Sequence, residues 1–485
     1  MVPPCGIASR VRGSYGNSVS TIATLAFGFG ILALFALYWD PKSRTSPSLW
    51  IPTVWILLAG SRMVTAWFGN PVDILQTASE VGEGSPIDRL ILTSLLMLGI
   101  IVLGCRARRV LRVLKMNWPL LAFFGYCALT TLWSADPDLA LKRWFKAIGD
   151  VVMVLIILTD RNRMEAIKKI ITRVAFILIP LSVLLIKFYP DVGRTYSLED
   201  GLVTNTGVTA NKNMLGVICL VAGLGCVWLF IRAIHDSRRR NRQLLALGAA
   251  LAMIAWVFAL ANSITPLFCF VTGSMLIIMV NLPGTHKPSN VHIAVAAMLS
   301  AAALVFVLPE IFTSIIQAFG RNTTLSGRTD LWKALTAMDT HPWIGTGFES
   351  FWLGNRLEDL WSIFPWQPNE AHNGYLEVYL NLGWVGVILL LNLLVMGYRR
   401  LIDVYRRDPM AGSLRLGYFA AAAAYSLAEA GFRMLDPMWI FLLLVIIAVP
   451  DTTAYQEVIL PLDESQALVP VSFADDDGQV FARTY

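Results

Sequence analysis

The sequence has few charged residues and few cysteines. Only 15% of its 485 residues are charged, whereas 56% are hydrophobic, and the mean hydropathy is +0.60. The core of a soluble domain needs far fewer apolar residues. The six cysteines are scattered, mostly inside apolar runs, and form neither a CxxC pair nor a metal-ligand spacing. The composition excludes an ordinary soluble enzyme and predicts an integral membrane protein.

Several other signals are missing. The sequence shows no soluble domain, no coiled-coil pattern and no clear internal repeat. The outer loops contain no Asp-rich metal motif, and no cofactor is predicted. The chain begins with arginines but without a compact apolar run that ends at a small-residue cleavage site, so we expect its first apolar run to be a retained anchor.

Apolar runs of the length that crosses a bilayer recur along most of the chain. They cover 21–39, 50–69, 88–105, 118–134, 147–159, 170–189, 213–234, 244–261, 263–282, 291–308, 374–398, 415–431 and 434–450. This pattern predicts an all-α polytopic membrane protein with twelve or thirteen transmembrane helices. The run 50–69 contains Arg62 and is either a full span or a re-entrant segment. We favour the re-entrant alternative, which leaves twelve spans and the N-terminus inside.

Lys and Arg gather in four loops that share one face if the spans alternate. These loops contain Arg106 to Lys115, Arg161 to Lys169, Arg238 to Arg242 and Arg399 to Arg407. Basic loops mark the cytoplasmic face, so the long segment 309–373 is predicted to lie outside. The same loops explain much of the net charge of +6, and no nucleic-acid partner is expected.

The outer segment 309–373 contains two candidate functional residues. Arg328 follows Ser326 and Gly327 at the start of a predicted amphipathic helix, and its guanidinium suits bidentate binding of phosphate oxygens. His372 lies at the membrane edge, and an imidazole with an ordinary pKa near 6.5 suits general-base catalysis. The alternatives are an arginine paired with a lipid headgroup and a helix-start histidine. His341 competes for the base role and ranks second, because Pro342 predicts a structural turn.

Polar residues also mark two helix starts. Asn373, Glu377 and Asn381 recur every four residues and predict a polar stripe that faces a cavity or the bundle interior. Asn373 is equally suited to cap its helix. On the other outer excursion, 188–212, Arg194 is a candidate phosphate ligand. Near it, Asn211, Lys212 and Asn213 open the next span, where a helix N-terminus favours anions. Capping by the asparagines and snorkelling by Lys212 are the alternatives.

Other charged residues near membrane depth are interpreted as structural, because such groups commonly pair with one another. They are Arg62, Lys142, Arg143, Lys146, Asp150, Glu429, Arg433 and Asp436.

Together, these motifs resemble the O-antigen ligase and polymerase superfamily. The resemblance is carried by Arg194, by Asn211-Lys212-Asn213-Met214-Leu215-Gly216, by Ser326-Gly327-Arg328 with Trp332, by Pro342-Trp343-Ile344-Gly345-Thr346-Gly347, and by His372-Asn373 with Gly383 and Gly386. Some sequence segments look more like the exopolysaccharide-polymerase branch of that superfamily. They are the segments around Trp55, Ser61-Arg62, Trp67 and Val208 to Asn213.

The resemblance implies an inverting, metal-independent glycosyltransferase with a GT-C-like helical membrane fold. Its donor would be an undecaprenyl-diphosphate-linked oligosaccharide on the periplasmic face of a bacterial inner membrane. Arg328, Arg194 and Lys212 would bind the diphosphate, and His372 would deprotonate the acceptor hydroxyl. The supporting residues would be Asn211, Asn213, Asn373 and Glu377. The implied partners are the lipid-linked oligosaccharide, the bilayer, and chain-length-control and export proteins.

The expected organisation has N-terminal helices in 1–187, a catalytic core in 188–398, C-terminal helices in 399–450 and a cytoplasmic tail in 451–485. Three alternatives to a polymerase stay open. The first is an O-antigen ligase that transfers glycan to a lipid A core. The second is a polysaccharide or bicarbonate-like anion transporter, which predicts midplane substrate residues and broken helices. The third is a non-catalytic member of a polysaccharide-assembly complex.

Overall fold

A computed structural model of the protein describes residues 7–68, 85–196, 201–235, 240–282, 287–307, 326–338, 340–364, 366–450, 473–474 and 480–481. The chain divides into two compact units, Met1–Ala448 and Val449–Tyr485. Several features of the sequence lie outside the described residues: Arg238 and Arg239, the part of the predicted outer segment that falls in 308–325, and most of the predicted tail.

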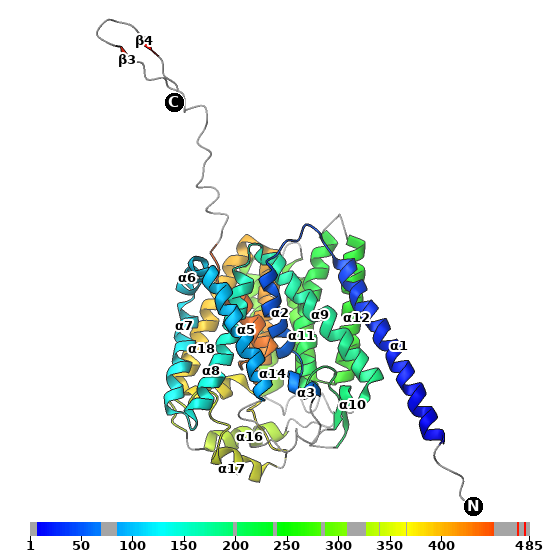
Figure 1. Ribbon diagram of the computed structural model, residues 1–485. Coiled ribbons are helices and arrows are strands. Elements are labelled where there is room, and N and C mark those ends of the chain that lie inside the picture. Colours follow the sequence, from blue (N-terminus) through cyan, green and yellow to red (C-terminus); the bar gives the residue numbers. More distant parts are fainter. Residues whose placement is uncertain are drawn as a thin grey trace, which may run out of the picture. The chain divides into compact units, whose positions relative to one another are not determined.

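The first unit is a bundle of α-helices (Figure 1). The helices are α1 (Ile7–Tyr38), α2 (Trp50–Ala59), α3 (Val64–Phe68), α5 (Pro86–Cys105), α6 (Ala107–Met116), α7 (Trp118–Thr130), α8 (Pro137–Leu158), α9 (Arg163–Phe188), α10 (Pro190–Gly193), α11 (Lys212–His235), α12 (Arg240–Ala261), α13 (Ile264–Val280), α14 (Pro288–Val307), α16 (Ser326–Ala337), α17 (Asn355–Ile363), α18 (Gly374–Arg407), α19 (Pro409–Tyr425) and α20 (Pro437–Ile446), with short 3-10 helices at Pro47–Leu49 and Thr131–Trp133. Seven of the described helices are long and apolar enough to cross a membrane, and four more apolar helices are shorter. The predicted all-α polytopic class is therefore confirmed.

Strands are short and few among the described residues. β1 (Arg194–Tyr196) and β2 (Val203–Asn205) form an antiparallel hairpin in the excursion before α11. In the second unit, β3 (Phe473–Ala474) pairs with β4 (Val480–Phe481).

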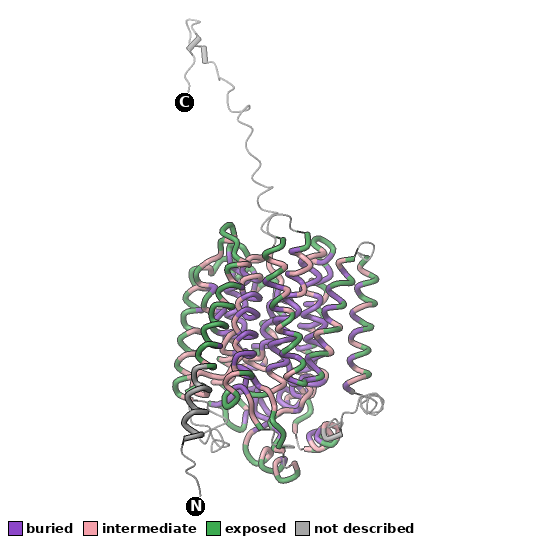
Figure 2. The backbone as a smooth tube through the Cα atoms, turned by 90° about the vertical axis from the view of Figure 1, so that its right-hand side faces the viewer, coloured by how far each residue is buried: buried purple, intermediate pink, exposed green. Residues whose placement is uncertain are grey.

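The centre of the bundle consists of helices that are mostly apolar and largely buried. α9, α11, α19 and α20 contribute side chains with almost no exposed surface, among them Ile179, Leu215, Tyr418 and Trp439. A helix without a polar face is stable only when it is surrounded by apolar groups. Figure 2 shows the buried tube concentrated inside the bundle and exposed segments at its edge, where α1 lies.

The basic loops meet at one end of the bundle. Arg106, which follows α5, donates from Nη1 to the carbonyl of Ile156 at the end of α8 (3.0 Å). Arg400, near the end of α18, donates from Nη1 to Oδ1 of Asn117 (2.6 Å). α6 belongs to this end, whereas α16 and α17 lie at the opposite one (Figure 1). The alternation of spans used to predict the orientation therefore agrees with the described loops.

The run 50–69 passes from one end of the bundle to the other. At its start, the amide of Ser46 donates to Oδ2 of Asp160 at the basic-loop end (3.1 Å). After the break between α2 and α3, Arg62 donates from Nε to the carbonyl of Thr209 in the opposite excursion (3.0 Å). Arg62 is thus satisfied by protein at the membrane edge. The run therefore crosses the bundle once, unlike the favoured re-entrant segment, and α1 starts at the end where α16 lies (Figure 1).

α18 is interrupted at Gly383, whose φ of 64° belongs to the left-handed region that favours glycine. A Cβ atom there would lie 2.3 Å from the backbone of the segment 342–347. That segment supplies partners for the broken helix: the amide of Trp384 donates to the carbonyl of Pro342 (2.9 Å). The Pro342 to Gly347 motif therefore fills a helix break and fastens the outer segment to the bundle.

Candidate functional site

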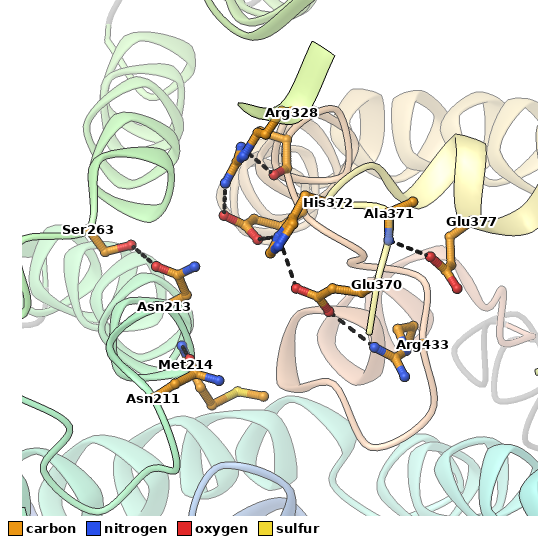
Figure 3. Close-up of polar contacts among 12 residues, drawn as sticks. Asn211, Asn213, Met214, Ser263, Arg328, Glu370, Ala371, His372, Glu377 and Arg433 are labelled. Carbon is orange, nitrogen blue, oxygen red and sulfur yellow. Dashed lines mark hydrogen bonds and ion pairs between the residues drawn. The ribbon is translucent and has the colours of Figure 1, made fainter. Parts of the chain in front are cut away.

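Five charged side chains meet at the end of the bundle that carries α16 and α17. We call them the loop-end charge cluster: Arg328, Glu370, His372, Glu429 and Arg433. Arg328 lies in the first turn of α16, Glu370 and His372 precede α18, and Glu429 and Arg433 lie between α19 and α20. Three segments that are distant in the sequence therefore build one site (Figure 3).

Positive and negative groups alternate through the cluster. Nη2 of Arg328 lies 3.0 Å from Oε1 of Glu429, and Oε2 of Glu429 lies 3.1 Å from Nδ1 of His372. The same Nδ1 lies 3.0 Å from Oε1 of Glu370, whose Oε2 accepts from Nη1 of Arg433 at 3.1 Å. The side chain of Glu429 is only 4% exposed, so the carboxylate that joins Arg328 to His372 is shielded from water.

The amphipathic pattern of α16 determines where Arg328 lies. Leu331 and Leu335 are fully buried and pack against Phe351 and Leu360 of the same outer segment. Protein therefore covers the apolar side of the predicted amphipathic helix. Arg328 also donates from Nη1 to the carbonyl of Ala428 (2.8 Å), so its guanidinium is held at two points.

His372 has an unusual backbone conformation. Its φ is 48°, in the left-handed region that side chains rarely adopt. The next residue, Asn373, caps α18 by accepting from the amides of Tyr375 and Leu376 (both 3.1 Å), and Trp366 packs beside the imidazole. Such local strain persists only where the surroundings enforce it, and it is common at functional sites.

The cluster shifts the proton affinities of its members. Burial alone would lower the pKa of His372, but hydrogen bonds to Glu370 and Glu429, together with their charges, outweigh burial and raise it to about 10. Burial would likewise raise the pKa of Glu370, but the hydrogen bond from His372 and the charges of His372 and Arg433 lower it. The cluster therefore holds an imidazolium between two carboxylates at neutral pH.

Three members of the cluster offer the ligand types of a metal site. Glu370, His372 and Glu429 place one ligand atom each within 4.8 Å of one another. However, each carboxylate already accepts from a guanidinium, and a divalent cation would be repelled by Arg328 and Arg433. The donor set fits an ion-pair network better than a metal centre.

The polar stripe of α18 faces the bundle interior, as predicted, but its members are occupied by protein. Glu377 accepts from the amide of Ala371 (2.9 Å) and from the indole of Trp352. Asn381 accepts from the amides of Ser350 and Phe351 (2.8 and 3.0 Å). The stripe therefore holds the backbone of the outer segment at two places: beside His372, through Glu377, and at Ser350 and Phe351, through Asn381.

A small cavity lies beside this stripe. Its volume is about 30 Å³, and its lining includes Glu349, Glu377, Asn381 and Arg433. A buried water needs on the order of 10–15 Å³ measured this way, so the cavity has room for water but not for a sugar.

The predicted residues of the other excursion have local partners. Asn211 accepts from the amide of Met214 (2.8 Å) and caps α11, and Asn213 accepts from the hydroxyl of Ser263 (3.1 Å). Figure 3 draws both beside the loop-end charge cluster, without a contact to it. Lys212 is half-buried and forms no hydrogen bond or salt bridge with a described residue. These contacts agree with the capping alternative for Asn211.

Arg194 is not brought into the cluster by any contact among the described residues. Its Nε and Nη2 both donate to the carbonyl of Ile186, at 3.1 and 2.9 Å, and so complete the end of α9. His341 also has a local role, since its carbonyl accepts from the amide of Gly345 (2.8 Å) in the predicted turn.

Glu370, Glu429 and Arg433 were not predicted as site residues. The sequence pattern favours a structural role for the last two, and Glu370 is not among the predicted candidates. Two signals point to them in retrospect. Glu370 lies two residues before the candidate histidine. Arg433 lies in the short break between the apolar runs 415–431 and 434–450, and Glu429 lies near the end of the first of these runs.

Two comparisons with known proteins bear on the site. A family model described as O-antigen ligase matches residues 247–391, which include Arg328 and His372. The chain is also similar to the exopolysaccharide production protein ExoQ of Rhizobium meliloti (strain 1021), with 26% identity over 303 residues. This alignment covers 59% of the chain and 66% of that relative. Both findings support the similarity to the O-antigen ligase and polymerase superfamily that the motifs indicated.

Proposed function

We propose that the protein is a membrane glycosyltransferase that polymerises undecaprenyl-diphosphate-linked repeat units of a surface polysaccharide or exopolysaccharide. The reaction would take place on the periplasmic face of an inner membrane. The observation that carries the proposal is the link from Arg328 through Glu429 to His372. It brings together a guanidinium, which is suited to bind phosphate, and an imidazole, which is suited to accept a proton. The family match supports a polysaccharide ligase or polymerase in general, and the similarity to an exopolysaccharide production protein favours the polymerase.

The proposed reaction is a displacement at the anomeric carbon of the donor. The acceptor hydroxyl forms a new bond to this carbon, the bond to the diphosphate oxygen breaks, and the configuration inverts. The hydroxyl proton passes to Nε2 of His372, since Nδ1 faces Glu370 and Glu429. A carboxylate that holds one ring nitrogen orients the imidazole and makes the other a stronger base.

Arg328 would stabilise the negative charge that develops on the leaving diphosphate. A guanidinium binds two phosphate oxygens at once and needs no metal for this purpose. In the structure its charge is balanced by Glu429 at 3.0 Å, so the donor diphosphate would compete with Glu429 for the guanidinium. Glu429 would then stay hydrogen-bonded to His372 alone.

Lys212 and Arg194 are the further candidates for diphosphate binding. Lys212 begins α11 and forms no salt bridge with a described residue, so its ammonium is available to an anion. Arg194 would have to leave the carbonyl of Ile186 before it binds a ligand. We therefore rank Lys212 above Arg194 in the proposed site.

The polymerase and its first alternative, the O-antigen ligase, differ in the acceptor of the glycan. A ligase would transfer the glycan to a lipid A core, and the description of the matching family model favours this reading. A transporter is supported less, although α18 is broken at Gly383 as transporter helices often are. The break is filled by residues 342–347 rather than by polar groups that face a substrate path.

The proposal is tested by His372→Ala and Arg328→Ala in a strain that lacks the native gene, with His341→Ala as the matched control. We expect both site variants to insert normally and to accumulate single repeat units on undecaprenyl diphosphate, because a base and a phosphate ligand are removed. The control should make long polymer. Long polymer from both site variants would refute the catalytic assignment, and polymer that is made but not joined to lipid A core would indicate a ligase.

A further inference from the structure

A large cavity lies at the basic-loop end of the bundle, opposite the loop-end charge cluster. Its volume is about 940 Å³. We call it the arginine cavity, because five of its lining residues are arginines: Arg44, Arg106, Arg108, Arg109 and Arg161. They come from the loop after α1, from the junction of α5 and α6, and from the turn between α8 and α9. The proposed transferase site does not use any of them.

Three of these guanidiniums form no salt bridge with a residue that the structure describes. Arg44, Arg108 and Arg161 are exposed and form no salt bridge or side-chain hydrogen bond with a described residue. Lys169, at the same end, is by contrast already occupied, since it donates to the carbonyl of Ser43 (2.8 Å). A general excess of cytoplasmic cations explains the presence of arginines. It does not explain why three unpaired ones converge on one cavity.

Arg106 gives the cavity a fixed wall. Its Nη1 donates to the carbonyl of Ile156 (3.0 Å), and its Nη2 donates to the hydroxyl of Ser48 (2.8 Å). Arg109 points to the same helix end and donates from Nη1 to the carbonyl of Thr159 (3.4 Å). These bonds hold the junction of α5 and α6 against α8, so the unpaired arginines surround a preformed space.

The remaining lining connects the cavity to the membrane. Gly104 and Cys105, the last residues of α5, lie in its wall. Directly before them on α5, Ile100 and Ile101 expose 47% and 60% of their surface, as residues in contact with lipid tails do. An acyl chain that lies on α5 would thus carry its headgroup into the cavity.

We propose that the arginine cavity binds the phosphate headgroup of an anionic phospholipid of the surrounding leaflet. Cationic pockets at the membrane surface attract anionic headgroups by about fivefold in affinity for each basic residue. A lipid fits better than a soluble phosphate compound, because the apolar surface of α5 continues into the cavity wall. The proposal does not depend on the transferase activity.

The test uses the full chain in nanodiscs made of equal parts phosphatidylglycerol and phosphatidylcholine, with bound lipid counted by native mass spectrometry. The test variant combines Arg44→Gln, Arg108→Gln and Arg161→Gln. The matched control combines Arg399→Gln, Arg406→Gln and Arg407→Gln, which removes the same charge from the same end of the bundle. We expect the test variant to lose phosphatidylglycerol by at least about tenfold, and the control by less than twofold.

Three results would overturn the proposal. Equal losses in the two triple variants would indicate general charge attraction without a site. Equal retention of phosphatidylcholine and phosphatidylglycerol by the unmodified protein would remove the role of headgroup charge. Displacement of the lipid by inorganic phosphate or glycerol phosphate would identify a soluble ligand instead. Thermal unfolding of both triple variants checks that they are folded, and the three single variants of the cavity repeat the measurement with smaller changes.

Discussion

The arginines at the two ends of the bundle differ in whether they form salt bridges. At the loop end, Arg328 and Arg433 are paired with buried or half-buried carboxylates that also hold His372. In the arginine cavity, Arg44, Arg108 and Arg161 are exposed and have no counter-charge among the described residues. Pairing fixes the geometry of a site before a substrate arrives. Unpaired exposed charges instead provide attraction for an anion without fixing its position.

The largest expected difference is in the rate of glycan transfer, between a variant that lacks the arginine of a buried pair and one that lacks the arginine of an exposed pair. Arg328→Ala removes the proposed diphosphate ligand and leaves Glu429 without its guanidinium, so we expect glycan transfer to fall by about a hundredfold or more. Arg406→Ala breaks an exposed pair with Asp403 at the opposite end and should change the rate less than twofold. The measurement is transfer from lipid-linked donor in proteoliposomes. Similar losses in both variants would contradict the assignment of Arg328.

Glu429→Gln tests whether the buried carboxylate organises the cluster. The change keeps the size of the side chain but leaves Arg328 and His372 as neighbouring cations, so we expect a loss of about 3–5 kcal/mol in the free energy of unfolding. Glu358→Gln, in the exposed face of α17, is the control and should stay within about 0.5 kcal/mol. Denaturation of the purified protein in detergent measures both. Equal stability of the two variants would mean that Glu429 has no structural role.

The pH dependence of transfer sharpens the role of His372. A general base must be neutral, and the pKa of His372 is raised to about 10. The rate should therefore rise with pH from 7 towards 10, by up to tenfold per unit, while lipid binding in the arginine cavity stays constant because arginines remain charged. A rate that is flat or falls over this range would assign the proton to a different base and leave His372 as a fixed cation.

Whereas the rate should rise with pH on the alkaline side, the stability of the protein should fall. Because the folded-state pKa of His372 lies above its ordinary value of 6.5, its ion pairs contribute fully below pH 6.5 and are lost as pH rises towards about 10. The lowered pKa of Glu370 makes its contribution complete above its ordinary value near 4.5, and this contribution is lost as pH falls below that value. Hydrogen exchange of residues 366–376 at several pH values measures this window. Constant protection across it would contradict the ion-pair description.

The smallest expected difference is the response to salt. Exposed charges are screened over a Debye length of about 10 Å at 0.1 M salt, whereas buried pairs are screened much less. Raising the salt concentration should weaken phosphatidylglycerol binding in the arginine cavity by a few fold. It should leave the unfolding midpoint of the protein, to which the buried pairs of the loop-end charge cluster contribute, nearly unchanged. A larger effect of salt on unfolding than on phosphatidylglycerol binding would contradict the contrast between the two ends.

Much of the fold follows from the sequence because membrane helices depend mainly on local apolar length. The predicted apolar runs overlap with described helices, and the basic loops lie at one end of the bundle. The run 50–69 was the exception. Arg62 suggested a segment that turns back, but Thr206 and Thr209 satisfy its guanidinium at the far end. That compensation is a tertiary contact between distant residues, and local pattern does not reveal it.

The site was only partly predictable for the same reason. Arg328 and His372 were recognisable from their motif and from their place on the outer segment. Glu429, which joins them, is 101 positions from Arg328 in the sequence, and only the packing of α16 against the outer segment brings it into contact. Asn211 and Asn373 illustrate the converse, because residues chosen for a functional pattern proved to have capping contacts.

The central claim is tested most directly by glycan transfer in proteoliposomes that contain only purified protein and the undecaprenyl-diphosphate-linked repeat unit. We predict that the unmodified protein extends the repeat unit into longer lipid-linked chains, and that His372→Ala, folded and inserted to the same level, produces none above background. Chain extension by His372→Ala at the unmodified rate would contradict the assignment of the loop-end charge cluster as the catalytic site.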